Sequence, residues 1–133
     1  MFTLHPQLEK DGIVIREFPL SRLLLLNDSR YPWFVLVPRR EAITEIYQLG
    51  EADQQQLLRE SSQLGEFLMQ EFNGDKLNIG ALGNLVPQLH LHHIVRFKDD
   101  EAWPGPVWGV GCATPYREEE LALMRGRCQK LDL

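Results

Sequence analysis

The hydrophobic and polar residues of the chain follow two different periods, which separate strands from helices. In the N-terminal part the apolar residues come in short runs: "GIVIREF" (residues 12–18), "RLLLLND" (22–28) and "WFVLV" (33–37). The turn-forming pair Asn27-Asp28 follows the second run, and prolines flank the third. Short apolar runs bounded in this way are typical of strands. We therefore expect three strands here, the first two joined as a hairpin.

The pattern becomes helical further along the chain. Apolar residues recur there at the three- and four-residue spacing of one helix face, at Leu57, Leu58, Leu64, Phe67, Leu68 and Phe72. Acidic residues between Gly50 and Asp53 favour a start there, and Asn73-Gly74 suits a left-handed helix end. We expect one long amphipathic helix between these points, packed on the strands.

The remaining segments complete an α+β order. "KLNIGALG" (76–83) and "PQLHLHHIVRF" (87–97) predict two more strands, and a tail rich in Pro and Gly predicts little regular structure before a C-terminal helix in 117–131. This order favours an antiparallel β-sheet of about five strands, covered by one long amphipathic helix and a C-terminal helix. Nothing divides the chain, so we expect one domain over residues 1–133, with a core of about 10–110 and a tail and helix in 111–133.

Charge and composition narrow the classes of partner. The net charge of −5 disfavours binding of long nucleic acid, but it permits a small phosphorylated ligand at a local site. The longest apolar run, at 23–26, is too short to span a membrane, and the N-terminus lacks a signal-peptide pattern. Cys112 and Cys128 have no CxxC spacing, which favours reduced thiols over a disulfide. We expect a cytoplasmic protein with no membrane contact.

Three of the four histidines lie close together, at positions 90, 92 and 93. Side chains alternate between the two faces of a strand, so Gln88, His90 and His92 point one way. His93 and the intervening leucines point the other way, which suits a face packed on the long helix. The face that carries His90 and His92 is then free to meet a ligand.

Two imidazoles on alternate strand positions are about 6.5–7 Å apart, which lets them reach different atoms of one phosphate group. A neutral imidazole can attack phosphorus, and its neighbour can bind the oxyanion or protonate a leaving group. A metal site is one alternative, but such sites use three or four ligands and the only other histidine is His5. The other alternative is a set of ordinary strand histidines, which we favour for His93 alone. We expect no metal and no cofactor.

This segment resembles the signature of the histidine-triad (HIT) family, His-φ-His-φ-His-φ-φ, where φ is hydrophobic. Gln88 falls at the first triad position, His90 at the middle and His92 at the third. Upstream, Gly83-Asn84-Leu85-Val86 is similar to the family's Gly-Gln-Ser/Thr-Val, and Asn78-Ile79-Gly80 to its Asn-x-Gly. The resemblance covers about residues 10–110 and implies the HIT fold.

The resemblance implies a nucleotide hydrolase or transferase that acts on phosphoramidates, dinucleoside polyphosphates or related compounds. By this resemblance His90 attacks the α-phosphorus to form a nucleotidyl-histidine, and His92 donates to phosphate oxygens or to the leaving group. Gln88 can orient a neighbour but cannot titrate. A nucleotide-binding module that has lost catalysis is the alternative, since Trp33 also replaces a histidine common in the family.

Further site residues follow from the same resemblance. Gly83 and Asn84 would contact phosphate, and Asn78 would lie near the ribose-phosphate. Asn27 or Asp28 would hold the ribose hydroxyls. Apolar residues of the early strands, such as Leu25 and Val37, would form the base pocket.

The family also implies a homodimer, in which a C-terminal Trp-Pro element approaches the partner's site. Trp103-Pro104 in "AWPGPVWG" looks similar. The alternative is that the tryptophans pack the tail onto its own chain.

Overall fold

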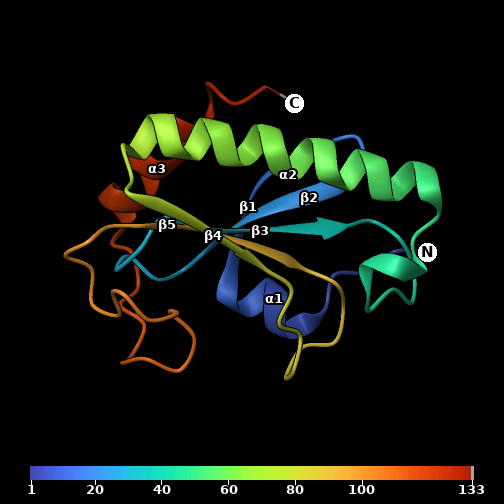
Figure 1. Cartoon of the computed structure of the whole chain (residues 1–133), viewed down its shortest axis with the longest axis horizontal. Coiled ribbons are helices and arrows are strands. Elements are labelled where there is room, and N and C mark those ends of the chain that lie inside the picture. The colour runs from blue at the N-terminus through green and yellow to red at the C-terminus, as the bar shows by residue number, and fades with distance from the viewer. Residues whose placement is uncertain (133) are drawn as a thin grey trace.

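One five-stranded antiparallel sheet organises the chain, with the strand order β1-β2-β3-β5-β4. The structure is a computed structural model that describes residues 1–132. The elements are α1 (Pro6–Asp11), β1 (Gly12–Glu17), β2 (Ser21–Leu26), β3 (Trp33–Pro38), η1 (Ile46–Gln48), α2 (Glu51–Phe72), β4 (Lys76–Gly80), β5 (Leu91–Arg96) and α3 (Glu118–Cys128). Figure 1 shows α2 across one face of the sheet and α1 on the other. The predicted α+β class and all five predicted strands are confirmed.

The long helix α2 forms where its residues predict it. Acidic residues lie in its first turn, and Asn73 ends it in the left-handed conformation at φ 52°. Leu57, Leu64 and Leu68 are buried against the sheet. Leu58 does not belong to this stripe, because it is 67% exposed. Adjacent helical residues point about 100° apart, so Leu57 and Leu58 cannot both face the sheet.

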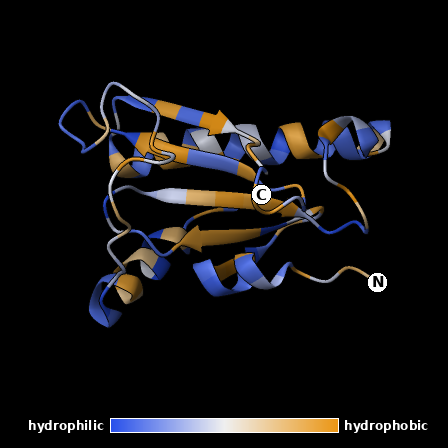
Figure 2. Cartoon of the chain, turned by 90° about the horizontal axis from the view of Figure 1, so that it is seen from below, coloured by the Kyte–Doolittle hydropathy of each residue, from blue (hydrophilic) through white to orange (hydrophobic). Residues whose placement is uncertain are grey.

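The central strands are buried on both faces. Leu23, Leu25 and Phe34 pack in the core beneath α2, whereas Leu24 and Val35 pack in a second cluster beneath α1. A strand with both faces covered needs a continuous apolar run, which is why "LLLL" and "WFVLV" show little alternation. Figure 2 shows hydrophobic residues along these strands, with the polar side of α1 turned away from them.

Two local features depart from the predictions. The short helix α1 was not predicted, and the side chain of His5 caps it by accepting a hydrogen bond from the Gln7 amide at 3.0 Å. The last strand, β5, begins at Leu91 rather than near Pro87. Residues 81–90 therefore form a loop, and His90 lies at its end, directly before β5.

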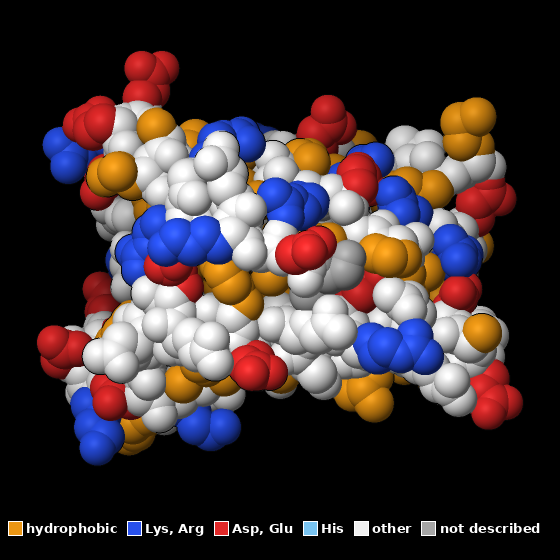
Figure 3. All heavy atoms as spheres, turned by 90° about the horizontal axis from the view of Figure 1, so that it is seen from above, with side chains coloured by type: hydrophobic (Ala, Val, Ile, Leu, Met, Phe, Trp, Pro, Cys, Tyr) orange, Lys and Arg blue, Asp and Glu red, His pale blue; other side chains and the backbone are white. Residues whose placement is uncertain are grey.

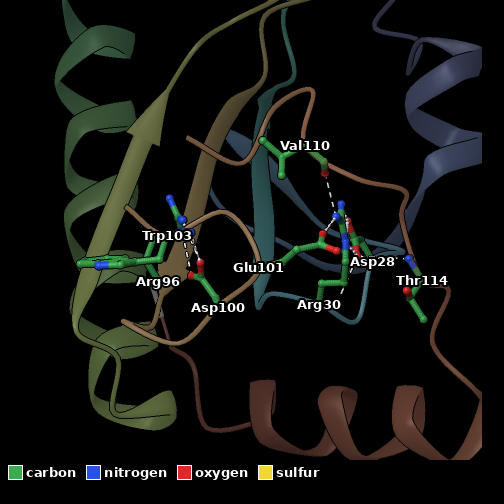
Figure 4. Close-up of polar contacts among 8 residues, drawn as sticks. All are labelled: Asp28, Arg30, Arg96, Asp100, Glu101, Trp103, Val110 and Thr114. Carbon is green, nitrogen blue, oxygen red and sulfur yellow. Dashed lines mark hydrogen bonds and ion pairs between the residues drawn. The ribbon is translucent and has the colours of Figure 1, made fainter. Parts of the chain in front are cut away.

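Two ion networks fasten the tail that follows β5 (Figure 4). Arg96 pairs with Asp100 at 2.8 Å, and their side chains are 2% and 4% exposed. Arg30 pairs with Asp28 at 2.8 Å and also with Glu101. As predicted, the tail has no helix or strand between residues 97 and 117 of the described chain.

The surface carries both signs of charge. On the face viewed from the α2 side, Lys and Arg side chains lie among Asp and Glu side chains (Figure 3). Cys112 is exposed and Cys128 is buried, and both are free thiols. Within residues 1–132, no helix has the length and apolar character needed to cross a membrane.

Candidate active site

His90 and His92 lie side by side on the face of the sheet that carries α1. Their ring centroids are 4.7 Å apart, and the two residues are 7% and 5% exposed. Both line a cavity of about 250 Å³. The predicted split of the histidines is confirmed, because His93 points to the opposite face and contacts Ser61 of α2.

The hydrogen-bond partners of the two rings fix where each ring carries its proton. His90 Nδ1 lies 2.8 Å from the carbonyl oxygen of Gln88. A carbonyl can only accept, so Nδ1 of His90 donates and Nε2 of the neutral ring keeps its lone pair. His92 has the opposite arrangement, because the Trp33 indole N–H donates to His92 Nδ1 at 2.9 Å. The indole nitrogen can only donate, so the neutral His92 ring carries its proton on Nε2.

Burial keeps both rings neutral. It lowers the pKa of His90 below its ordinary value of 6.5, and the nearby His5 adds to this effect. The pKa of His92 falls to about 3, first because the ring is buried and then because His90 and His93 lie close. The site at neutral pH therefore offers one nucleophilic nitrogen, His90 Nε2, beside one neutral donor, His92 Nε2–H.

His93 is a buried structural residue. Its Nδ1 donates to the Leu91 carbonyl at 3.0 Å, and the Ser61 hydroxyl lies 2.8 Å from its Nε2. The ring is fully buried, and burial lowers its pKa to about 4. Both nitrogens are engaged on the helix side of the sheet, so His93 takes no part in the cavity.

Gln88 contributes to the site through its backbone, while its side chain holds the N-terminal segment. Its Oε1 accepts from the His5 amide at 2.8 Å, and its Nε2 donates to the Thr3 carbonyl at 2.9 Å. The same residue thus orients His90 through its carbonyl and positions the segment that leads into α1. These partners lie more than eighty residues away in the sequence, so no local pattern could reveal them.

The cavity beside the histidine pair is formed by α1, by the end of β2, and by the loop before β5. Its lining residues are Leu8, Asp11, Leu26, Leu82, Gly83, Asn84, Leu85, Val86, His90, His92 and Trp108. Gly83 adopts φ +64°, which a residue with a side chain rarely adopts. Asn84 is exposed at the cavity wall. The predicted phosphate residues Gly83 and Asn84 therefore lie together with His90 and His92.

A second cavity of about 490 Å³ adjoins the first and shares Asp11, Leu26 and Trp108 with it. Asn27 and Asp28 line this cavity. The Asn27 side-chain oxygen, Oδ1, accepts from the Tyr116 amide at 2.8 Å. The Asp28 side chain is 6% exposed, and its carboxylate accepts from Arg30 and from the Thr114 amide (Figure 4).

The predicted base pocket needs one correction. Leu25 is fully buried in the core beneath α2, on the far side of the sheet from the histidine pair. Its neighbour Leu26 is only partly buried and lines both cavities. The error follows from strand alternation, since a displacement of one residue moves a side chain to the opposite face. Val37 is on the α1 face but is fully buried.

Trp108 is a site residue that the sequence did not single out. Its ring lies 5.3 Å from that of His92 and 6.3 Å from that of Trp33, both edge to face. A Cβ added at Gly80 would lie 3.2 Å from the Trp108 ring. The glycine of Asn78-Ile79-Gly80 therefore gives this tryptophan room against β4.

Asn78 and Trp103 contact Arg96 rather than either cavity. The Asn78 side-chain oxygen, Oδ1, accepts from Arg96 at 2.8 Å, and the Trp103 ring lies 5.6 Å from the guanidinium carbon. Tyr31 lies 5.6 Å from the same carbon, so two aromatic rings flank the charge. Trp103 and Trp108 of the tail therefore pack against residues of their own chain. A contact of Trp103 with a partner subunit stays a prediction.

The described residues, 1–132, contain no group of three or more His, Cys, Asp or Glu side chains arranged to hold a metal ion. One acidic residue, Asp11 on α1, is among the residues that line the cavity beside the histidine pair.

Comparison with known proteins places the fold in a known family. Residues 7–99 match the family model of the HIT domain. A histidine triad protein from Marinobacter aquaeolei VT8 is 53% identical with a TM-score of 0.97, over 98% of this chain and 96% of that one. A histidine triad protein from Bradyrhizobium japonicum is 44% identical with a TM-score of 0.96, over 98% and 97%.

A hypothetical histidine triad nucleotide-binding protein from Sulfolobus tokodaii shares only the fold, with 13% identity and a TM-score of 0.68 over 93% of this chain and 85% of that one. No curated protein matches the chain. The match to the family model and the identity to two solved histidine triad proteins lead to one conclusion. The chain belongs to the histidine-triad (HIT) family, as the residues around His90 predicted.

Proposed function

We propose that the protein is a nucleotide hydrolase or nucleotidyltransferase that acts at an α-phosphate through a nucleotidyl-histidine on His90. The observation that carries this proposal is the hydrogen bond from His90 Nδ1 to the Gln88 carbonyl, which leaves Nε2 as a lone pair in the cavity wall. A neutral, oriented imidazole is the form that attacks phosphorus. As Nε2 bonds to phosphorus, positive charge develops on the ring, and the Gln88 carbonyl dipole stabilises it.

The surrounding residues fit a bound nucleotide. His92 Nε2–H is placed to donate to a phosphate oxygen, with Gly83 and Asn84 on the same cavity wall. The ribose and base would occupy the adjoining cavity, where Asn27 is exposed and Asp28 is already bound by Arg30. We therefore assign the ribose contact to the side-chain NH2 of Asn27, whose Oδ1 is held by the Tyr116 amide, with Asp28 fixing the turn beneath it.

Two substitutions test this assignment. His90→Ala removes the nucleophile while leaving the buried core intact, so hydrolysis of adenosine and guanosine substrates should fall by several orders of magnitude. The matched control is His93→Gln, which changes the neighbouring buried histidine on the other face and should retain turnover. Unchanged activity in His90→Ala would show that His90 is not the nucleophile.

A nucleotide-binding module without catalysis is the second candidate. Replacement of the first triad histidine by Gln88 favours it, because that side chain binds the N-terminal segment and cannot take part in proton transfer. Such a module would bind nucleotides with measurable heat and form no covalent intermediate. Calorimetry combined with rapid quench separates the two candidates.

We further propose a homodimer formed through the open edge of the sheet at β4. Ile79 and Leu58 are 49% and 67% exposed, and they line a cavity of about 650 Å³ between β4 and α2. An exposed apolar edge strand readily pairs with a second copy. Ile79→Asp should lower the sedimentation coefficient measured at two concentrations. Val14→Asp, on the opposite edge strand β1 and 45% exposed, is the matched control and should leave the sedimentation coefficient unchanged.

The cytoplasmic location stays a prediction.

A further inference from the structure

Trp33 fixes the proton of His92 and thereby limits what His92 can do. The indole is 8% exposed on β3, and its N–H donates to His92 Nδ1 at 2.9 Å. Because the indole nitrogen has no acceptor capacity, the lone pair at this contact must belong to the imidazole. The neutral His92 ring therefore presents a single N–H, at Nε2.

Conversion of His92 to an imidazolium would break this arrangement. A proton added at Nδ1 would put two N–H groups head to head, and a buried donor without its acceptor costs about 1–3 kcal/mol. The ring also lies against His90, with His93 next to it on the strand and Trp108 edge-on at 5.3 Å. The one acidic residue in the cavity lining is Asp11, and its carboxylate accepts from Gln7. Burial and the neighbouring His90 and His93 all disfavour a positive charge on His92.

A neutral imidazole can donate a hydrogen bond but is a poor acid, because losing its only N–H proton would leave an imidazolate. His90 cannot supply a proton either, since its Nδ1–H is committed to the Gln88 carbonyl. Neither His90 nor His92 can therefore donate a proton to a departing amine. A phosphate leaving group needs no such proton, because it departs as a stable anion.

Resting on the proposed function, we infer that the site is specific for nucleotidyl anhydrides, whose leaving group is a phosphate, rather than for phosphoramidates, whose leaving group is an amine. The lone pair of His90 Nε2 forms the new bond to the α-phosphorus. The P–O bond to the leaving phosphate breaks, and its electron pair leaves with that oxygen. Water then attacks the α-phosphorus, the P–N bond to His90 breaks with its electrons returning to Nε2, and the water proton passes to solvent.

The tautomer can be measured on the wild-type protein without any turnover. The ¹⁵N shifts of the His92 ring, read from two-bond ¹H–¹⁵N correlations, should show protonated Nε2 and unprotonated Nδ1 from pH 8 to pH 5. A protonated Nδ1, or a His92 that titrates above pH 6, overturns the inference. Trp33→Phe removes the indole N–H while keeping a ring, and His92 should then titrate at higher pH. Trp108→Phe is the matched control and should leave the His92 tautomer unchanged.

The leaving-group preference is measured with substrate pairs that share one nucleoside, using diadenosine triphosphate against adenosine 5′-phosphoramidate and the guanosine equivalents. The wild type should favour the anhydride in kcat/KM by about 100-fold or more, the scale of a missing general acid. In Trp33→Phe this ratio should narrow, and the phosphoramidate rate should rise as the pH falls. Equal rates in the wild type overturn the inference while leaving the proposed function standing. If neither the anhydride nor the phosphoramidate is turned over, the proposed function is refuted. The inferred leaving-group preference is then refuted with it.

Discussion

Acid should destabilise this protein through His93, and the size of the effect follows from its surroundings. Both ring nitrogens are engaged, by the Leu91 carbonyl and the Ser61 hydroxyl, and the ring is fully buried. Burial holds its pKa at about 4 against 6.5 for the free side chain. Between these two pH values His93 is protonated in the unfolded chain and neutral in the folded chain.

The direction of the pH dependence follows from this difference. A histidine whose pKa is lowered in the folded state contributes its full stability above pH 6.5, and this stability is lost as the pH falls toward 4. The gap between 6.5 and about 4 corresponds to about 3 kcal/mol at 1.36 kcal/mol per pH unit. About 2 kcal/mol of this loss falls between pH 7 and pH 5.

The perturbation that isolates His93 is His93→Gln, which keeps a polar side chain but cannot titrate. Urea unfolding at pH 7, 6 and 5 gives the free energy of unfolding of both proteins by linear extrapolation. His93 also contributes to the lowered pKa of His92, but burial of the His92 ring is the larger cause and is the same in both proteins. The wild type should therefore lose about 2 kcal/mol more than the variant between pH 7 and pH 5. Parallel losses in the two proteins would refute the assignment of a neutral, buried His93.

Three other substitutions test the contacts that shape the site. Arg96→Met should leave the buried Asp100 carboxylate unpaired and cost about 3–5 kcal/mol of stability, measured by thermal unfolding, and a loss below 1 kcal/mol would contradict this. Gly111→Ala places a Cβ 2.6 Å from a Glu101 carboxylate oxygen at φ +64°, so it should lower stability by about 1–3 kcal/mol, whereas Gly126→Ala in α3 meets nothing within 4 Å and should not. Gln88→Ala should abolish hydrogen-exchange protection of the His5 amide while that of Leu91 in β5 persists, and continued protection at His5 would show that another group holds it.

Periodicity was sufficient to predict the sheet, the long helix and the face on which each histidine lies. The helix α2 has a stripe of leucines and an Asn-Gly end, so both its length and its position are encoded locally. The opposite faces of His92 and His93 follow from strand alternation alone. The short helix α1 could not be predicted, because its six residues bury only Leu8 and so show no period.

The polar partners of the site depend on tertiary contacts that no local pattern contains. Trp33 and His92 are far apart in the sequence and meet only because β3 pairs with β5. Trp33 replaces a histidine common in the family, which in the sequence suggested a loss of catalysis. In the structure its indole N–H gives His92 a fixed hydrogen-bond partner. The hydrogen-bond partners of Gln88, which are Thr3 and His5, are likewise brought to it only by folding.

The central claim is that His90 is the nucleophile, and trapping the intermediate tests it most directly. Wild-type protein mixed with a labelled dinucleoside polyphosphate and quenched within milliseconds in base should carry one nucleotidyl group, located by mass spectrometry on the peptide that contains His90. The label should be acid-labile and absent from His90→Ala. Turnover without such an intermediate, or a label that persists in His90→Ala, would contradict the account.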